Sequence, residues 1–479
     1  MPANSSSKTY VSYSYLILAV LAMTYLIVRA ASLAITFDEA WTIKDFVSLP
    51  FIEIINYTPC DANNHILNTL LIKLFFAIAP EYDFVARLPN LLAAVMGLFF
   101  AYKMTSRWLA SWLGLSCFVV LFANPFLLDF LALARGYGLS IGMLLASLYY
   151  LFNVVEKPNL KATALSMLFG ALAVLSNFAL LNYYVALLGV LVVLPILAKH
   201  SVSYLKWYGI LLPITAVLAG ISYEPIRKMR LANSLYYGGS DSFYEDTLSS
   251  LTHFSMYSKE ASAGSWMVLN VFLILLLLGS LLAFWYKRTL QTPKNAILAI
   301  FIIATSSVVM QHVLLETLFL QDRTALFFYP ILVLVFFFAV QEFADYWYAK
   351  VLAGIATTAV IINCCWHANF YKTVSWEYDA HTSHILAKLN EISEQTGEPA
   401  RLDFAFVFVS GIYHRLNQKK YTNIHLMRGG NDQEVNPNSD YYMYYTDPLN
   451  DANHQINQLP KDTFAYYPEE QVIVFKIRK

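Results

Sequence analysis

Long apolar segments alternate with short polar connections along the chain from Tyr15 to His367. Each segment has roughly 17 to 25 residues, and a helix of that length can cross a hydrocarbon core of about 30 Å. The pattern therefore predicts about eleven membrane-spanning helices. They fall at residues 15–35, 87–105, 109–124, 132–153, 162–180, 183–199, 207–222, 265–286, 296–315, 324–341 and 350–367.

Two other regions have a different pattern. The apolar stretch from Ile66 to Ala79 is short and carries Lys73 in its middle, which predicts a helix lying at the membrane interface. After residue 367 the chain predicts one helix at Trp376–Glu394 and then strand-like segments separated by turn-rich pieces such as 428–440. These strand-like segments are residues 402–411, 420–427, 440–446 and 469–477.

The expected fold is mainly α, with a polytopic bundle of membrane helices and a small α/β domain. We place the membrane domain at residues 1–367 and an extracytoplasmic domain at 368–479. Lysines and arginines in the short loops favour a cytoplasmic N-terminus. That orientation puts two larger loops, 36–86 and 223–264, on the outer face of the cell membrane.

Composition supports the membrane assignment and excludes other classes. Of the 479 residues 58% are hydrophobic and 13% are charged, about half the charged share of soluble proteins. Lysine plus arginine equals aspartate plus glutamate at 32 each, so no basic surface is available for nucleic acid. The four scattered cysteines resemble neither a disulfide framework nor a zinc site.

An acidic pair follows the first predicted span. Asp38 and Glu39 leave the membrane side by side, where a partly desolvated carboxylate can act as a general base. A structural interpretation is also open, because Thr36 and Glu39 have the spacing of a capping box. Capping accounts for Glu39 but does not require Asp38.

Polar residues also precede the short apolar stretch. Asn63 or Asn64 is interpreted as a helix N-cap, and His65 as a ligand for a metal or phosphate, a donor to a substrate hydroxyl, or a solvated side chain. We keep Asn64 and His65 as candidates for acceptor binding or an auxiliary role. Whether a divalent metal ion takes part is left open.

Two further clusters combine a carboxylate with an arginine. Asp129 and Arg135 are six residues apart, about 240° around an unbroken helix, so such a helix cannot pair them. Asp322 and Arg323 immediately precede the tenth span. A guanidinium near the mouth of a helical bundle is suited to clamp phosphate, and the alternative is an ion pair with a carboxylate. Asp129 and Asp322 are auxiliary candidates.

In order and spacing these segments resemble the GT-C membrane glycosyltransferases, in particular the branch that is protein-mannosyltransferase-like and aminoarabinose-transferase-like. The resemblance covers roughly residues 15 to 340. The segments are "FDEA", "NNHILNTLL", "RLPNLLAAVMGLFFAY", "ARGYGL" and "DRTALFFYPIL".

The resemblance implies transfer of a sugar from a polyprenyl-phosphate carrier to an extracytoplasmic lipid, glycan or protein. It implies that Asp38 is catalytic, with Glu39 beside it, and that Arg135 and Arg323 bind the phosphate of the donor. We add Tyr137 to these predicted phosphate-binding residues. The chain departs from many relatives, which have His-Pro-Pro at residues 64–66 and His-Tyr at residues 182–183.

Elementary chemistry agrees with such a transfer. A base must take the acceptor's proton while cations stabilise the departing phosphate, and a single displacement inverts the anomeric carbon. No glycine-rich nucleotide fingerprint is present in the sequence. The alternatives are a transporter or flippase, for which charges are expected near the midplane, and a polysaccharide polymerase or ligase, which needs no acidic pair.

Overall fold

The computed structural model describes residues 5–198, 203–286, 292–417, 421–427, 434–446 and 455–478. The chain divides into two compact units. The first comprises Met1–Ala30 and Leu49–Ala368, and the second comprises Ala31–Ser48 and Asn369–Lys479. The second unit therefore combines a short segment after the first helix with the C-terminal part of the chain.

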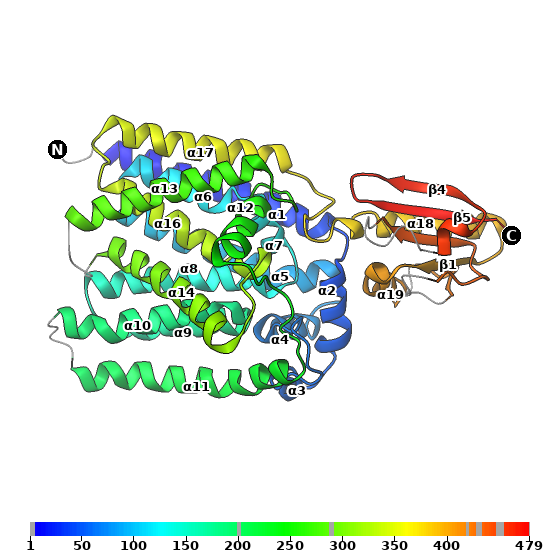
Figure 1. Cartoon of the computed structure of the whole chain (residues 1–479), viewed down its shortest axis with the longest axis horizontal. Coiled ribbons are helices and arrows are strands. Elements are labelled where there is room, and N and C mark those ends of the chain that lie inside the picture. The colour runs from blue at the N-terminus through cyan, green and yellow to red at the C-terminus, as the bar shows by residue number, and fades with distance from the viewer. Residues whose placement is uncertain are drawn as a thin grey trace. The chain divides into compact units, whose positions relative to one another are not determined.

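The first unit is a bundle of helices (Figure 1). Every predicted span falls on a helix of this bundle. The helices are α1 Ser5–Ser32, α3 Phe51–Ile55, α4 Ile66–Phe76, α5 Asp83–Trp108, α6 Ser111–Phe122, α7 Pro125–Ala132, α8 Gly136–Glu156, α9 Leu160–Ser176, α10 Leu181–Ala198, α11 Tyr204–Leu231, α12 Ser250–Ser255, α13 Ala263–Tyr286, α14 Pro293–Leu315, α15 Asp322–Ala325, α16 Phe328–Gln341 and α17 Trp347–His367.

The bundle has the length and composition of a multi-pass membrane protein. Within the described residues, seven helices are long and apolar enough to cross a membrane, and the bent pair α6 and α7 makes up to eight. The predicted spans 162–180, 265–286 and 324–341 fall on α9, α13 and α16, whose described apolar lengths are shorter. The interfacial stretch after Ile66 is the short apolar helix α4.

Helix α8 lies at the centre of the bundle, between α5 and α9 (Figure 1). Its packing is close because Gly142 faces the backbone of α5, where a Cβ would lie 2.5 Å from the carbonyl oxygen of Ala93. Small residues at such crossings let two membrane helices approach each other. In contrast, α1 and α17 are mostly exposed and apolar, as expected for helices that face lipid.

The chain breaks twice just before α8. Helices α6 and α7 meet at an angle of 62°, at a point where Asn124 caps the N–H of Leu127 and Pro125 occupies the first turn of α7. The fixed φ and missing donor of proline suit a helix start. The second break separates α7 from α8 at Arg135, whose extended backbone forms the N-cap of α8. The span predicted to begin at residue 132 therefore begins at Gly136, and Asp129 lies on a separate helix.

The second unit contains a five-stranded sheet in the order β2-β1-β3-β5-β4. β1 pairs in parallel with β2 and β3, whereas β5 is antiparallel to β3 and β4. The elements are α2 Phe37–Thr42, a π-helix Ile43–Val47, a 3-10 turn Glu377–Asp379, α18 Thr382–Thr396, β1 Ala400–Phe404, a 3-10 turn Phe406–Phe408, α19 Val409–Asn417, β2 Ile424–Leu426, β3 Tyr441–Tyr445, a 3-10 turn Gln455–Gln458, β4 Lys461–Tyr467 and β5 Val472–Ile477.

Several expectations for this unit were wrong in detail. The predicted strand 402–411 ends at Phe404, because the apolar run then continues into α19. β4 was not predicted. Among the described strands it is an edge strand beside β5, and it begins with Lys461 and Asp462, so its alternation of apolar and polar residues is weak. The predicted helix 376–394 begins at Thr382, after a 3-10 turn. Residues 428–433 of the turn-rich piece lie outside the described residues.

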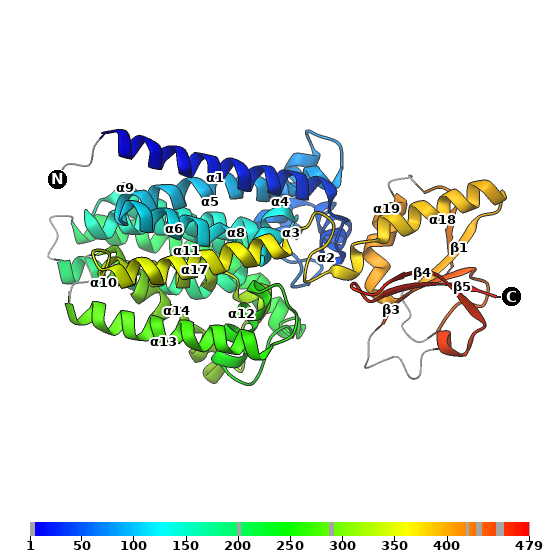
Figure 2. The ribbon, with the colours of Figure 1, turned by 90° about the horizontal axis from the view of Figure 1, so that it is seen from above.

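Both faces of the sheet are covered. Helices α18 and α19 pack on one face, where Leu386, Leu389 and Ile412 join a buried cluster with Leu402 and Val474 (Figure 2). A smaller cluster forms on the opposite face and contains Val435, Tyr442, Tyr444 and Ile456. The unit has its own apolar core, and this core positions the turn that carries Asp379.

Candidate functional site

Arg135 lies where α7 gives way to α8. Its Nη1 donates to the backbone carbonyl oxygen of Asn63 at 3.0 Å, and its guanidinium carbon lies 5.8 Å from the centre of the Tyr137 ring. The same ring meets the imidazole of His65 edge to face at 4.9 Å. Tyr137, a predicted phosphate ligand, therefore lies between Arg135 and His65.

His65 is held in a tight and dry setting. Its side chain is 7% exposed and hydrogen-bonds the backbone of Ser176, while its Nε2 has no hydrogen-bond partner among the described residues. Gly136 allows this approach, because a Cβ there would lie 2.6 Å from Cγ of His65. Burial lowers the pKa of His65 well below its usual value, and the charges of Arg135 and Arg323 lower it further. The imidazole is consequently neutral near pH 7.

Asn64 orients the chain before His65. Its Nδ2 donates to the carbonyl oxygen of Ile54 at 2.9 Å, and its Oδ1 accepts from Oγ1 of Thr69 at 3.0 Å. The Tyr57 hydroxyl donates to the backbone carbonyl of Asn64. The N-cap of α4 is His65, so the expected N-cap at Asn63 or Asn64 was wrong. Both ends of the Asn64 amide are engaged within the protein.

Arg323 and Asp322 lie in the first turn of α15 and share one tyrosine. Nη1 of Arg323 donates to the hydroxyl of Tyr237 at 3.2 Å, and its guanidinium carbon lies 4.1 Å from the centre of that ring. The Tyr237 hydroxyl in turn donates to Asp322, whose backbone N–H donates to Ser250 Oγ at 2.9 Å. Asp322 is thus engaged in holding Tyr237 against Arg323.

These groups form one cluster, although they come from distant parts of the chain. The charges of Arg135 and Arg323 both lower the pKa of His65, in addition to its burial, and these three residues are grouped with Tyr137 and Tyr237, the rings that the two arginines contact. We call these five residues the basic cluster. Two guanidinium groups beside neutral aromatic and imidazole side chains are suited to bind a phosphate group.

Asp129 takes part in a different interaction. Its carboxylate forms a buried ion pair with Arg29 of α1 and accepts from the Tyr257 hydroxyl at 3.2 Å. Nη1 of Arg29 donates to the Tyr25 hydroxyl at 2.9 Å. Both members of the pair are about 1–2% exposed, so the pair ties α1 to α7 inside the bundle.

The predicted acidic pair lies in the second unit. The backbone N–H of Glu39 donates to Oγ1 of Thr36 at 3.4 Å, and Oε2 of Glu39 accepts from the backbone N–H of Thr36 at 3.0 Å. The expected capping box is confirmed. Glu39 is fully buried, whereas Asp38 is half-buried. The capping interaction therefore occupies Glu39 and leaves Asp38 as the more accessible carboxylate of the pair.

A third carboxyl group joins this pair from the C-terminal part of the chain. Oδ2 of Asp379 accepts from the backbone N–H of Phe37 at 2.7 Å, and Asp379 is 1% exposed. Burial raises the pKa of Asp379 well above its usual value, and the negative charges of Asp38 and Glu39 raise it further. We call Asp38, Glu39 and Asp379 the acidic cluster. Asp379 was not predicted as a site residue, because nothing local in the sequence distinguishes it from other polar residues of the tail.

Neither cluster resembles a metal site. Over the parts of the chain that the structure describes, no three His, Cys, Asp or Glu side chains come together in a way that would hold a metal ion.

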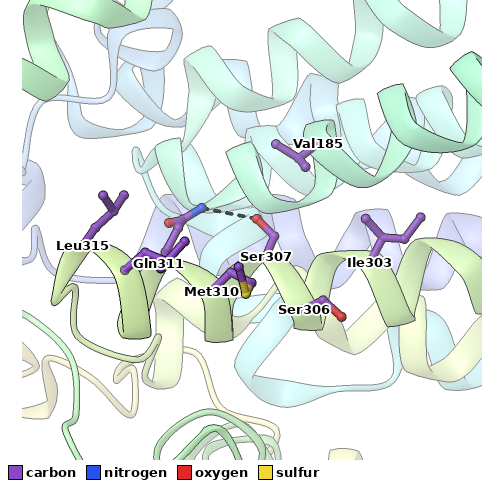
Figure 3. Close-up of a pocket in the computed structure, with 8 residues that line it drawn as sticks. Val185, Ile303, Ser306, Ser307, Met310, Gln311 and Leu315 are labelled. Carbon is purple, nitrogen blue, oxygen red and sulfur yellow. Dashed lines mark hydrogen bonds between the residues drawn. The ribbon is translucent and has the colours of Figure 1, made fainter.

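A separate hollow of about 380 Å³ lies between α10 and α14 (Figure 3). Asn182 stands beside it, where the resemblance expects histidine, and its Oδ1 accepts from Ser307 at 2.8 Å and from Gln311 at 2.9 Å. The rest of the lining is mostly apolar and includes Val185, Ile303, Met310, Leu314 and Leu315. With no charged residue in its lining, this hollow is distinct from the basic cluster.

One family model matches part of the chain. Residues 65–223 match the family described as dolichyl-phosphate-mannose-protein mannosyltransferase. The range includes His65, Arg135 and Tyr137, and the resemblance to membrane glycosyltransferases is confirmed for this part of the chain.

Two crystal structures of ArnT from Cupriavidus metallidurans are similar in fold. The apo form gives a TM-score of 0.48 and the form bound to undecaprenyl phosphate gives 0.46. In both cases the sequence identity is 10% and the similarity covers 98% of each chain. No curated protein matches the sequence.

Proposed function

We propose that this protein is an integral-membrane glycosyltransferase that moves a sugar from a polyprenyl-phosphate carrier to an acceptor. The acceptor is a lipid, glycan or protein on the extracytoplasmic face of the cell membrane. The basic cluster is the observation that carries the proposal. It contains two arginines from distant segments whose charges both reach His65, in a membrane bundle whose residues 65–223 match a family described as dolichyl-phosphate-mannose-protein mannosyltransferase.

In this proposal the basic cluster binds the donor. Arg135 and Arg323 hold the phosphate, and their charge stabilises the leaving group as its bond to the sugar breaks. Tyr137 orients Arg135. His65, neutral and with Nε2 unpartnered among the described residues, accepts a hydrogen bond from a sugar hydroxyl.

The acidic cluster supplies the base. Asp38 takes the proton from the acceptor as the acceptor oxygen or nitrogen attacks the anomeric carbon. One displacement with one base inverts the configuration of the sugar. The mechanism requires that Asp38 and Arg135 engage the same pair of substrates.

Transfer by the purified protein tests the proposal. The protein in detergent is given labelled polyprenyl-phosphate sugars and a membrane extract as the acceptor source. Wild-type protein is expected to move label to the acceptor, and Asp38→Asn and Arg135→Ala are expected to lose most of this transfer. Arg107→Gln, which alters an exposed ion pair with Glu156, is the matched control. Full transfer by both site variants would contradict the assigned roles.

A transporter is the second candidate, and the bend between α6 and α7 favours it. Broken spans are common in transporters, where they open a substrate site. Here the break has a local cause in the Asn124 cap and Pro125. Movement of an intact lipid-linked sugar across proteoliposome membranes, without transfer to an acceptor, would support this candidate over the glycosyltransferase.

A further inference from the structure

The contact between Asp379 and Phe37 joins two segments that lie far apart in the sequence. Phe37 opens α2, the helix that carries Asp38 and Glu39, and its N–H is one of the donors that a helix start leaves without an internal partner. Asp379 accepts this N–H at 2.7 Å. The C-terminal part of the chain therefore fixes the backbone immediately before Asp38.

The surroundings of Asp379 favour a neutral acid. Its Oδ1 is buried and has no hydrogen-bond partner among the described residues, which is unfavourable for a carboxylate. From α2 it faces the charges of Asp38 and Glu39, and from α19 it faces Arg415. Gly411 of α19 lies beside Oδ1, where a Cβ would be in ordinary van der Waals contact with it at 3.5 Å. Two negative charges and one positive charge thus surround a dry carboxyl group.

We propose that Asp379 is a positioning residue that works as a neutral carboxylic acid, holding the backbone of Phe37 and thereby placing Asp38 without adding a third negative charge. This inference rests on the proposed function of Asp38 as the base. The neutral acid accepts the Phe37 N–H through one oxygen. Its other oxygen carries the proton, so the acidic cluster holds fewer negative charges than carboxyl groups.

The proposal predicts the direction in which pH changes the rate of sugar transfer. Burial and the charges of Asp38 and Glu39 raise the pKa of Asp379, so its proton is lost only as the pH rises. Loss of that proton places a third negative charge in the cluster and disturbs Asp38 by like-charge repulsion. Transfer should therefore fall on the alkaline side, and Asp379→Asn, which stays neutral and keeps an acceptor oxygen, should extend activity to higher pH.

Two measurements on the full-length protein test the proposal. The first is hydrogen exchange, read by mass spectrometry, of peptides that cover residues 36–42. Asp379→Ala is expected to raise deuterium uptake there several-fold, whereas Asp379→Asn should match wild type. Asp403→Asn is the matched control, because Asp403 is another buried carboxyl group that accepts a backbone N–H, that of Asn436 at 2.7 Å. Unchanged uptake in Asp379→Ala, or equally raised uptake in Asp379→Asn, would overturn the proposal.

The second measurement is the pH profile of sugar transfer. Asp379→Asn should retain at least half of the wild-type rate near neutrality, with its alkaline limit shifted upward. A profile identical to that of wild type would overturn the neutral form of Asp379. If wild type shows no transfer at all, the proposed function fails, and the exchange result still decides whether Asp379 positions α2.

Discussion

The basic and acidic clusters are built on opposite principles. In the basic cluster, Arg135 and Arg323 lie against tyrosine rings, and the pKa of His65 is lowered by burial and then by the charges of these arginines, so the positive charge is carried by the two guanidinium groups. In the acidic cluster, Glu39 is buried in a capping box and Asp379 is buried and favoured as a neutral acid, so Asp38 is the most accessible carboxylate of the three.

The two clusters suit the two halves of the proposed reaction, which are binding of the donor phosphate and removal of the acceptor's proton. A phosphate site benefits from several cations acting together, whereas a general base needs one accessible carboxylate. The basic cluster belongs to the membrane unit and the acidic cluster to the second unit. Each cluster can therefore be perturbed by substitutions within its own unit.

The largest effect on stability is expected at a charge pair outside both clusters. Arg29→Met leaves Asp129 buried without its cation, which should lower the free energy of unfolding by about 3–5 kcal/mol. Arg107→Met, at an exposed pair with Glu156, should cost less than about 1 kcal/mol. Thermal unfolding in detergent compares the two variants. Equal losses would show that Arg29 and Asp129 are not a structural pair and return Asp129 to the candidate site.

The basic cluster should show the largest effect on transfer that leaves the fold intact. Arg135→Ala is expected to lower kcat/KM by about 10²–10³, as for loss of one preorganised donor to a developing charge. Arg135→Lys should recover part of this, because it restores the charge without the planar fork. Steady-state kinetics with a labelled donor measure both variants. An alanine variant with wild-type kcat/KM would show that Arg135 does not bind the donor phosphate.

His65 should make the stability of the membrane unit depend on pH. Its folded pKa lies below the unfolded value of about 6.5, so below that pH the unfolded state takes up a proton that the folded state refuses. Stability should fall by up to about 1.4 kcal/mol for each pH unit below 6.5. His65→Gln should remove this part of the pH dependence, and His425→Gln, at an exposed strand position, should not. The free energy of unfolding is measured between pH 5 and 7. The same pH dependence in wild type and His65→Gln would contradict a neutral imidazole in the folded protein.

The smallest effect is expected at the capping box of the acidic cluster. Glu39→Ala should destabilise α2 by about 1 kcal/mol, the usual cost of a lost cap. Glu39→Gln should be close to wild type, because glutamine at this position can still reach back to the Thr36 N–H. Hydrogen exchange of residues 36–42 is the measurement. A larger loss of transfer in Glu39→Gln than in Asp38→Asn would show that Glu39, not Asp38, acts as the base.

Sequence patterns predicted the bundle well, for a physical reason. A membrane helix needs a long apolar run, and that requirement is visible locally, so each predicted span falls on a helix. The break at Arg135 was not predicted, because it depends on the packing of Gly136 against His65 and Ser176. Edge strand β4 was not predicted, because its sequence alternates weakly and its position beside β5 follows only from the folded sheet.

The candidate residues were predictable as charges, but their partners were not. Arg135 and Arg323 stood out because charge near a membrane is costly. The link between Asp129 and Arg29, and that between Asp379 and Phe37, join segments whose proximity follows only from the tertiary fold. A carboxyl group in a polar tail carries no local sign that it will be buried beside another acid.

The central claim is that the two clusters serve one reaction. An electron cryomicroscopy structure of the protein with bound polyprenyl phosphate tests it most directly. We expect the phosphate within hydrogen-bond distance of the Arg135 guanidinium, with the Asp38 carboxylate on the same side of the membrane and separated from that phosphate by a space the size of one sugar. A phosphate bound away from Arg135, or an Asp38 that faces the opposite side of the membrane, would contradict it.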